Sequence, residues 1–195
     1  TARTLKLIEA VRDQGIGVVG ISHLLGEVFR ISDTAQGMRR GAGGFSADEL
    51  RLAIVSKLPP YIAWPDAPAE EPIVLGVLGE TVNWRLLEEL LRDVRVRQRA
   101  VQVRPFASAA EVAGVQLLYV PAAFMGDVAA LPPDRLRGVV TVGEDPRFLR
   151  QGGIINLQPD AAGAKINLQV SLRNARAQGV RIQTPLLRIA EVVDR

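Results

Sequence analysis

The chain has 195 residues, no cysteine, one histidine and a formal net charge of +3 at pH 7. Hydrophobic residues make up 48% of it, which suits one moderate domain with a sizeable core, or one domain with an appendage. The missing cysteines exclude disulfides and thiolate metal sites, and one histidine is too few for an ordinary zinc site, so we predict no metal and no cofactor. The charges form no basic stripe, so we also predict no nucleic-acid partner.

Membrane and export signals are missing from the sequence. No apolar run reaches the roughly 18 residues of a transmembrane helix, so we predict no membrane span. The stretch that starts at Thr1 lacks the basic flank, the long apolar run and the small-residue cleavage site of a signal peptide. We therefore expect this sequence to be a mature form or a fragment.

The glycine-rich run at residues 41–44 marks a flexible joint. Directly after it, Ser46 and Glu49 have the spacing of a capping box, which predicts the start of a helix. We therefore predict two parts, an appendage over residues 1–44 and a domain over residues 45–195.

The appendage is predicted to be a helix, the buried strand IGVVGIS and a second helix. A single apolar strand does not form a stable sheet in water. We therefore expect the appendage to dock on the larger domain through Val18, Val19 and Ile21.

The domain alternates between helical and strand patterns in chain order. Helices are predicted at residues 47–58, from the Asn83 cap to Leu91, after the Ser108–Glu111 capping-box match, from Ser171 to Gln178, and from Thr184 onward. Strands are predicted at residues 73–79, 100–106, 115–121 and 138–143, followed by a hairpin over residues 152–170. This alternation predicts an α/β fold with a layered sheet flanked by helices, and with a C-terminal hairpin and helices.

Two pairs of residues are candidates for binding. Trp64 and Pro65 follow a proline-rich helix stop; they form either a partner-binding surface or a packed turn, and we favour the turn because aromatic side chains usually fill cores. Gly152 and Gly153 precede a strand and either let a ligand approach the backbone or supply unusual backbone angles, and we favour the angles.

Charged residues offer two further candidates. Arg95, Arg97 and Arg99 share one face if the chain is extended there. They contact anionic lipid headgroups, an acidic partner or solvent. We favour solvent, with the arginines on an exposed sheet edge where they discourage pairing with another strand. Glu144 and Asp145 follow a strand, and one interpretation is a catalytic or metal-binding carboxylate pair. We favour the other interpretation, in which Asp145, directly before Pro146, is a helix cap.

The first 44 residues resemble the end of the ATP-binding domain of ABC transporters, through RDQGIGVVGISH, EVFRISD and MRRG. The resemblance places His23 at the position of the switch histidine, which contacts the γ-phosphate. The phosphate-binding loop G-x-x-x-x-G-K-[ST], the LSGGQ signature and the Asp-Glu strand are absent from the 195 residues, and one histidine cannot replace them in phosphoryl transfer. We therefore interpret His23 as an orphan polar residue at a strand end and predict no catalytic residue.

Residues 45–193 resemble the YfiR-like family. The matching segments, in order, are ADELRLAIVSKLPPYIAWP, IVLGVLGE, GVQLLYVP, VVTVGEDPRFLRQGGIINL and GVRIQTPLLRIAEVV, the last of which resembles a closing helix. Two family positions that often hold cysteine match Gly76 and Val115 here, so the resemblance implies no disulfide-based redox sensing in this chain.

This resemblance implies a small, non-enzymatic periplasmic α/β domain. Its expected partner is the periplasmic part of an inner-membrane signalling protein, such as a diguanylate cyclase that it represses, and a homodimer is left open. Two alternatives remain: a nucleotide-related fragment of an ABC transporter ATPase, and a fusion in which an ABC segment replaces the export signal of a YfiR-like protein.

Overall fold

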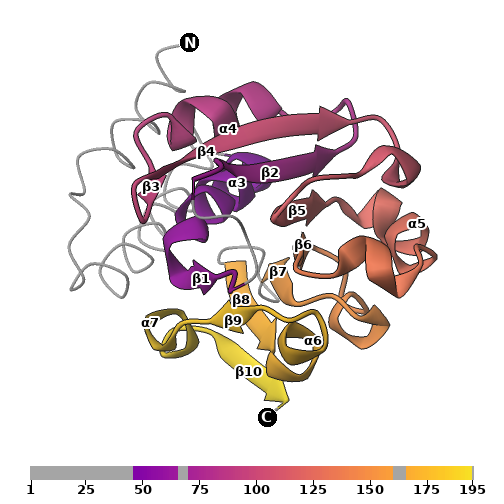
Figure 1. Ribbon diagram of the computed structural model, residues 1–195. Coiled ribbons are helices and arrows are strands. Elements are labelled where there is room, and N and C mark those ends of the chain that lie inside the picture. The colour runs from indigo at the N-terminus through magenta and orange to yellow at the C-terminus, as the bar shows by residue number, and fades with distance from the viewer. Residues whose placement is uncertain (1–45, 66–69, 160–165, 195) are drawn as a thin grey trace, which may run out of the picture.

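The computed structural model describes residues 46–65, 70–159 and 166–194 (Figure 1). The predicted appendage over residues 1–44, with His23 and its docking residues, lies outside the described residues. The two-part division of the chain therefore stays a prediction.

The described elements alternate between strands and helices, as the sequence predicts. The helices are α3 (Ala47–Lys57), α4 (Trp84–Leu91), α5 (Met125–Ala129), α6 (Leu172–Ala177) and α7 (Thr184–Leu187). Short 3-10 turns are η1 (Pro59–Tyr61), η2 (Ala109–Glu111), η3 (Ala122–Phe124), η4 (Pro133–Leu136) and η5 (Leu149–Gln151). The strands are β1 (Ile62–Ala63), β2 (Ile73–Leu78), β3 (Arg95–Val96), β4 (Arg99–Phe106), β5 (Leu117–Val120), β6 (Val140–Gly143), β7 (Ile155–Pro159), β8 (Ile166–Ser171), β9 (Arg181–Ile182) and β10 (Glu191–Asp194).

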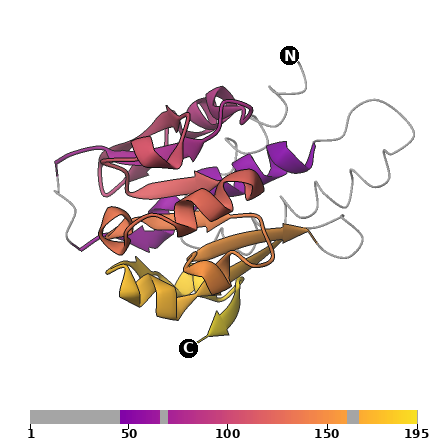
Figure 2. The same ribbon diagram turned by 90° about the vertical axis from the view of Figure 1, so that its right-hand side faces the viewer.

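Among the described residues, eight strands form one sheet in the order β10-β8-β7-β6-β5-β2-β4-β3, while β1 pairs with β9 separately. The neighbouring strands from β4 to β7 are parallel, and the antiparallel pairs β3–β4 and β7–β8 flank them. Figure 2 shows the succession from the magenta β4 end to the yellow C-terminal strand. Parallel neighbours need crossover connections, which explains the helices and turns between them. The predicted α/β sheet with helices and a C-terminal hairpin is confirmed.

Both faces of the sheet are covered, so the central strands are apolar without a break. In β2, Ile73, Leu75 and Val77 pack into the cluster that α3 and α4 complete, whereas Val74 and Leu78 pack into the cluster that η2 and α5 complete. This two-sided burial is why IVLGVL contains no polar residue.

Capping side chains set the starts of three helices at the predicted places. Ser46 Oγ accepts the Glu49 N–H at 3.1 Å, and Glu49 Oε2 accepts the Ser46 N–H at 2.7 Å, which completes the capping box of α3. Asn83 caps α4 by accepting the Leu86 N–H, and Ser171 caps α6 by accepting the Asn174 N–H.

The closing helix begins at Thr184 as predicted, but it is much shorter than predicted. Helix α7 ends at Leu187, Thr184 is its first residue and not its cap, and the chain then forms β10, parallel to β8. Asp194 at the end of β10 accepts the Ser171 hydroxyl at 2.8 Å and the Arg173 N–H at 3.1 Å. Long-range contacts with the start of α6 therefore hold this segment extended, and no local sequence pattern contains them.

Two smaller expectations also change. Ser108 does not cap the backbone of η2; its hydroxyl donates to Glu111 Oε1 at 3.1 Å. The arginine stretch is not one continuous strand, because Arg97 and Gln98, with φ of 50° and 72°, form the turn between β3 and β4.

The Phe148 ring is held between two glycines. A Cβ atom added to Gly143 would lie 2.4 Å from the ring, and one added to Gly153 would lie 2.2 Å from it. The neighbouring Gly152 has a φ of 95°, a left-handed conformation that favours glycine. The favoured interpretation of unusual backbone angles therefore describes Gly152, whereas Gly153 makes room for an aromatic ring.

We expect Gly153→Ala to lower the free energy of unfolding by about 1–3 kcal/mol, because the added methyl group overlaps a buried ring that cannot move away freely. Gly126→Ala in α5 is the control, because nothing lies within 4 Å of its added Cβ, and we expect it to raise stability by about 0.5–1 kcal/mol. Urea unfolding of both variants measures the difference. Equal stability of the Gly153 variant and the parent chain would contradict this account of Phe148.

Candidate functional site

The order of the strands creates an opening at their carboxyl ends. Helix α4 connects β2 to β4, which pairs with one edge of β2. The next long strand, β5, pairs with the other edge of β2. The connection after β2 leads to the helix layer of α3 and α4, while the connection after β5 leads to the opposite layer with α5 (Figure 1). In open α/β sheets, ligands bind where neighbouring connections diverge in this way.

A crevice of about 480 Å³ lies at this place, within the volume range of small-molecule sites. Its walls are the start of α3, the connection after β2 and the ends of β5 and β6. The lining residues are Ser46, Asp48, Glu49, Leu52, Thr81, Val82, Asn83, Tyr119, Pro121 and Glu144.

Glu144, just after β6, is the best-anchored polar group of the crevice. Its Oε2 accepts the Tyr119 hydroxyl at 2.8 Å, and its Oε1 accepts the Ala122 N–H at 3.0 Å. Arg51 Nε lies 3.4 Å from Glu144 Oε2 in an ion pair, and Arg51 Nη1 donates to Asp48 Oδ1 at 2.8 Å. These contacts tie β5, β6 and α3 together at the base of the crevice.

Tyr119 stays protonated in this setting. Burial raises the pKa of its hydroxyl well above the ordinary tyrosine value, and the negative charge of Glu144, together with the hydrogen bond between them, raises that pKa further. The Tyr119 hydroxyl is therefore a fixed hydrogen-bond donor. It orients Glu144 and does not ionise near neutral pH.

The crevice carries more negative than positive charge. Among the described residues, Asp48, Glu49 and Glu144 line it, and Arg51 forms ion pairs with Asp48 and Glu144. Both oxygens of Glu144 accept hydrogen bonds from the chain itself, so the position of this carboxylate is fixed.

The second member of the Glu144–Asp145 pair faces a different neighbour. Asp145 Oδ1 accepts the Arg147 N–H at 2.8 Å and the Arg147 guanidinium at 3.1 Å, and these bonds lower the Asp145 pKa. Asp145 thus closes a local turn just after Glu144. Its interpretation as a helix cap is wrong, because η5 begins only at Leu149 and Phe148 is its N-cap. Among the described residues no group of three or more His, Cys, Asp or Glu side chains is placed to hold a metal ion.

Trp64 and Pro65 lie away from the crevice. The Trp64 indole N–H donates to the Gln116 carbonyl at 2.9 Å, directly before β5, and its half-buried ring packs on the apolar cluster under α3. Pro65 is exposed. The contacts of Trp64 are those of a packed turn, while a role of this pair in binding stays a prediction.

Gly152 and Gly153 border a smaller cavity of about 200 Å³. Its walls are of mixed polarity: apolar side chains come from α5, the connections around η4 and the Phe148 ring, and polar ones from Thr141, Gln151 and Gln178. The two pairs of predicted binding residues are therefore not brought together, and binding at the glycine pair also stays a prediction.

Sequence reasoning singled out Glu144 but missed Tyr119 and Arg51. Tyr119 stands near the end of the predicted strand VQLLYVP, so its place at the carboxyl edge was available from the sequence. Its pairing with Glu144 was not, because the two residues meet only when β5 and β6 lie side by side.

The family model that matches the chain is that of the YfiR/HmsC-like family (DUF4154), over residues 48–191. The chain belongs to the YfiR/HmsC-like family. The match covers most of the described elements, from α3 to the first residue of β10, and confirms the YfiR-like resemblance found in the sequence, while the resemblance of residues 1–44 to ABC transporters stays a prediction. Membership in this family supports a general role as a periplasmic regulator.

Two solved structures are similar to part of this chain. A conserved domain protein from Vibrio cholerae O1 biovar El Tor str. N16961 has 14% sequence identity and a TM-score of 0.49, over 78% of this chain and 62% of that one. An ABC domain in complex with L-Trp from Streptococcus pneumonia has 13% identity and a TM-score of 0.44, over 73% of this chain and 59% of that one. The YfiR/HmsC-like chain thus spans less than two thirds of each of these structures.

No curated protein sequence matches the YfiR/HmsC-like chain. Within the part of the chain that the structure describes, no helix has the length and apolar character to span a bilayer.

Tyr119 gives stability a defined pH dependence. The pKa of Tyr119 in the folded chain exceeds the value of about 10 in an unfolded chain, so above pH 10 the unfolded state releases this proton first. The free energy of unfolding should therefore fall above pH 10, by up to about 1.4 kcal/mol per pH unit for this one group.

Tyr119→Phe should remove this part of the alkaline slope, and it should cost about 1–3 kcal/mol at pH 7 because Glu144 loses a hydrogen bond. Tyr61→Phe is the matched control, since the pKa of this half-buried tyrosine is raised by burial without a carboxylate partner. Urea unfolding at a series of pH values measures both slopes. If Tyr119→Phe changes the slope no more than Tyr61→Phe, the Tyr119–Glu144 pair does not stabilise the fold.

Proposed function

We propose that this chain is a non-enzymatic periplasmic regulator that binds the periplasmic part of an inner-membrane signalling protein, such as a diguanylate cyclase, and represses it. Membership in the YfiR/HmsC-like family over residues 48–191 is the observation that carries this proposal. The partner's identity comes from the family resemblance.

The chemistry of the crevice supports binding and not turnover. Its best-buried carboxylate, Glu144, is held by Tyr119 and Ala122, and its cation, Arg51, is held between Asp48 and Glu144. Groups that are paired within the chain keep a fixed geometry, which favours recognition at small reorganisation cost. We propose that the partner, or a small molecule that controls its binding, contacts the chain at this crevice.

Blocking the crevice tests the proposal. Thr81 is exposed at the rim, and in Thr81→Arg a long cationic side chain would occupy the space between the carboxylates without breaking the bonds of Glu144. In cells that lack the native protein, the parent chain should lower cyclic di-GMP and Thr81→Arg should not. Calorimetry with the purified periplasmic segment of the cyclase should show an affinity loss of about tenfold or more.

Thr184→Arg is the control, because Thr184 is exposed on α7 and is not part of the crevice wall. It should behave as the parent chain does. Unchanged cyclic di-GMP with and without the parent chain would reject the regulatory role, whereas equal activity of both variants would reject the crevice as its site.

The nucleotide-handling alternative has its own test. Because the phosphate-binding loop is absent from the sequence, titration of the full chain with ATP should give no binding heat at millimolar nucleotide, and no phosphate should be released. Saturable heat, or ATP hydrolysis that His23→Ala abolishes, would contradict the non-enzymatic assignment.

A further inference from the structure

The hairpin formed by β3 and β4 concentrates positive charge at one edge of the sheet. Residues 92–99 hold four arginines and one aspartate, a formal charge of 4 − 1 = +3. The described part of the chain places no strand beyond β3, so this hairpin is the outer edge. Its turn lies at the amino ends of the parallel strands, opposite to the crevice, because β4 begins at Arg99 and runs parallel to β2.

The turn keeps residues that its backbone does not favour. Arg97 and Gln98 both have left-handed φ angles, 50° and 72°, in a two-residue hairpin connection. Asn-Gly is the preferred pair for such a turn, and a long side chain there costs on the order of 1 kcal/mol per residue. Backbone strain of this kind persists mostly at functional positions, so turn chemistry alone does not account for Arg97.

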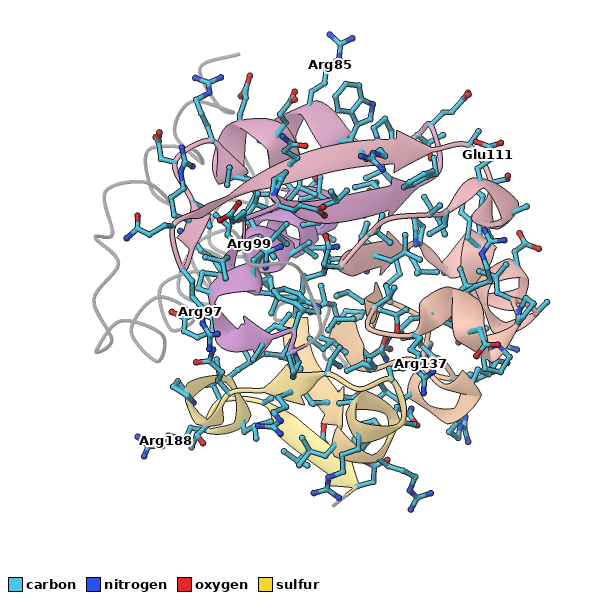
Figure 3. The ribbon with its side chains drawn as sticks, viewed as in Figure 1. Arg85, Arg97, Arg99, Glu111, Arg137 and Arg188 are labelled. Carbon is cyan, nitrogen blue, oxygen red and sulfur yellow. The ribbon has the colours of Figure 1, made fainter. Side chains whose placement is uncertain are left out.

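The arginines of the hairpin are arranged with one guanidinium free at the tip. Arg95 Nη1 donates to the carbonyls of Arg92 and Val94 at 2.9 Å, and Arg99 Nε donates to the Glu71 carbonyl. Arg97 is exposed and has no hydrogen bond or ion pair within the described residues. Figure 3 shows Arg97 and Arg99 together on the side of the molecule where β3 lies.

One terminal nitrogen of Arg99, Nη2, is buried without a hydrogen-bond partner. This nitrogen is not accessible at the surface, so the exposed Arg92, Arg95 and Arg97 carry the positive charge that a ligand can reach. Guanidinium groups bind phosphate oxygens in a bidentate manner, so this surface is complementary to phosphate-bearing partners.

The surroundings favour a lipid surface over an acidic protein. Stable protein interfaces have an apolar core. Among the described residues, only one large hydrophobic side chain is strongly exposed. It is Val193, on β10 at the other edge of the sheet. The hairpin thus offers charge without apolar contact area. Juxtamembrane basic residues bind anionic headgroups with about 1 kcal/mol each and need no apolar core.

We propose that the β3–β4 hairpin docks the chain on anionic phospholipid headgroups, with Arg97 as the leading contact. This surface goes beyond the proposed regulatory function and does not depend on the partner. It would hold the crevice, at the far end of the strands, facing away from the bilayer.

Sedimentation of the purified full chain with phosphatidylcholine vesicles, with and without phosphatidylglycerol, tests this docking. We expect binding only to vesicles that contain phosphatidylglycerol, and we expect it to weaken strongly between about 50 mM and about 500 mM salt, because the screening length shortens. Arg97→Gln should weaken vesicle binding about fivefold.

Two further variants test whether a loss of vesicle binding comes from the lost charge itself, from a change in folding or from the position of the charge. Replacing Arg97-Gln98 by Asn-Gly should make the turn more stable to urea while weakening vesicle binding as much as Arg97→Gln does. Arg150→Gln, an exposed arginine on η5 at the carboxyl end of β6, removes the same charge elsewhere and should bind as the parent chain does.

Equal binding to both kinds of vesicle, or an equal loss in Arg97→Gln and Arg150→Gln, would overturn the proposal. Binding to soluble polyglutamate without binding to phosphatidylglycerol vesicles would overturn it in favour of an acidic protein. Cyclase binding by Arg97→Gln in solution should equal that of the parent chain, so failure of the docking surface and failure of the regulatory role give different results.

Discussion

Strand β2 is the element on which the rest of the described structure depends, because it is buried on both faces and paired at both edges. All six of its residues are buried, and β4 and β5 pair with it in parallel. A strand in this position must be apolar throughout, and every neighbour that is parallel to it must be reached by a crossover. The two helix layers follow from that requirement.

The crevice is a second consequence of the same constraint. Since β4 and β5 lie on opposite edges of β2, the connections after β2 and β5 lead to opposite layers of the sheet. Glu144 and Tyr119, from neighbouring strands, meet at the point where the layers separate, and their hydrogen bond closes its base. A single polar pair thereby sets the shape of the opening and keeps its charge in place.

Charge is distributed unevenly between the two ends of the sheet. Carboxylates line the crevice at the carboxyl ends of the strands, while the arginines of the β3–β4 hairpin gather near the amino ends. The overall charge of +3 conceals this separation, because the opposing groups nearly cancel in the sum. An uneven distribution of this kind orients a protein between a charged surface and a partner.

The sequence by itself determined the α/β class, the burial of the central strands and the starts of α3, α4 and α6, because these depend on apolar runs and on capping residues within a few positions. Ordered motifs across residues 45–193 also indicated the family. Only the tertiary structure decided that the last residues form β10, because their partners in β8 and at the start of α6 are distant in the chain. The same holds for the Tyr119–Glu144 pair and for the room that Gly143 and Gly153 leave for Phe148, since strand order and ring packing are long-range choices that no local pattern contains.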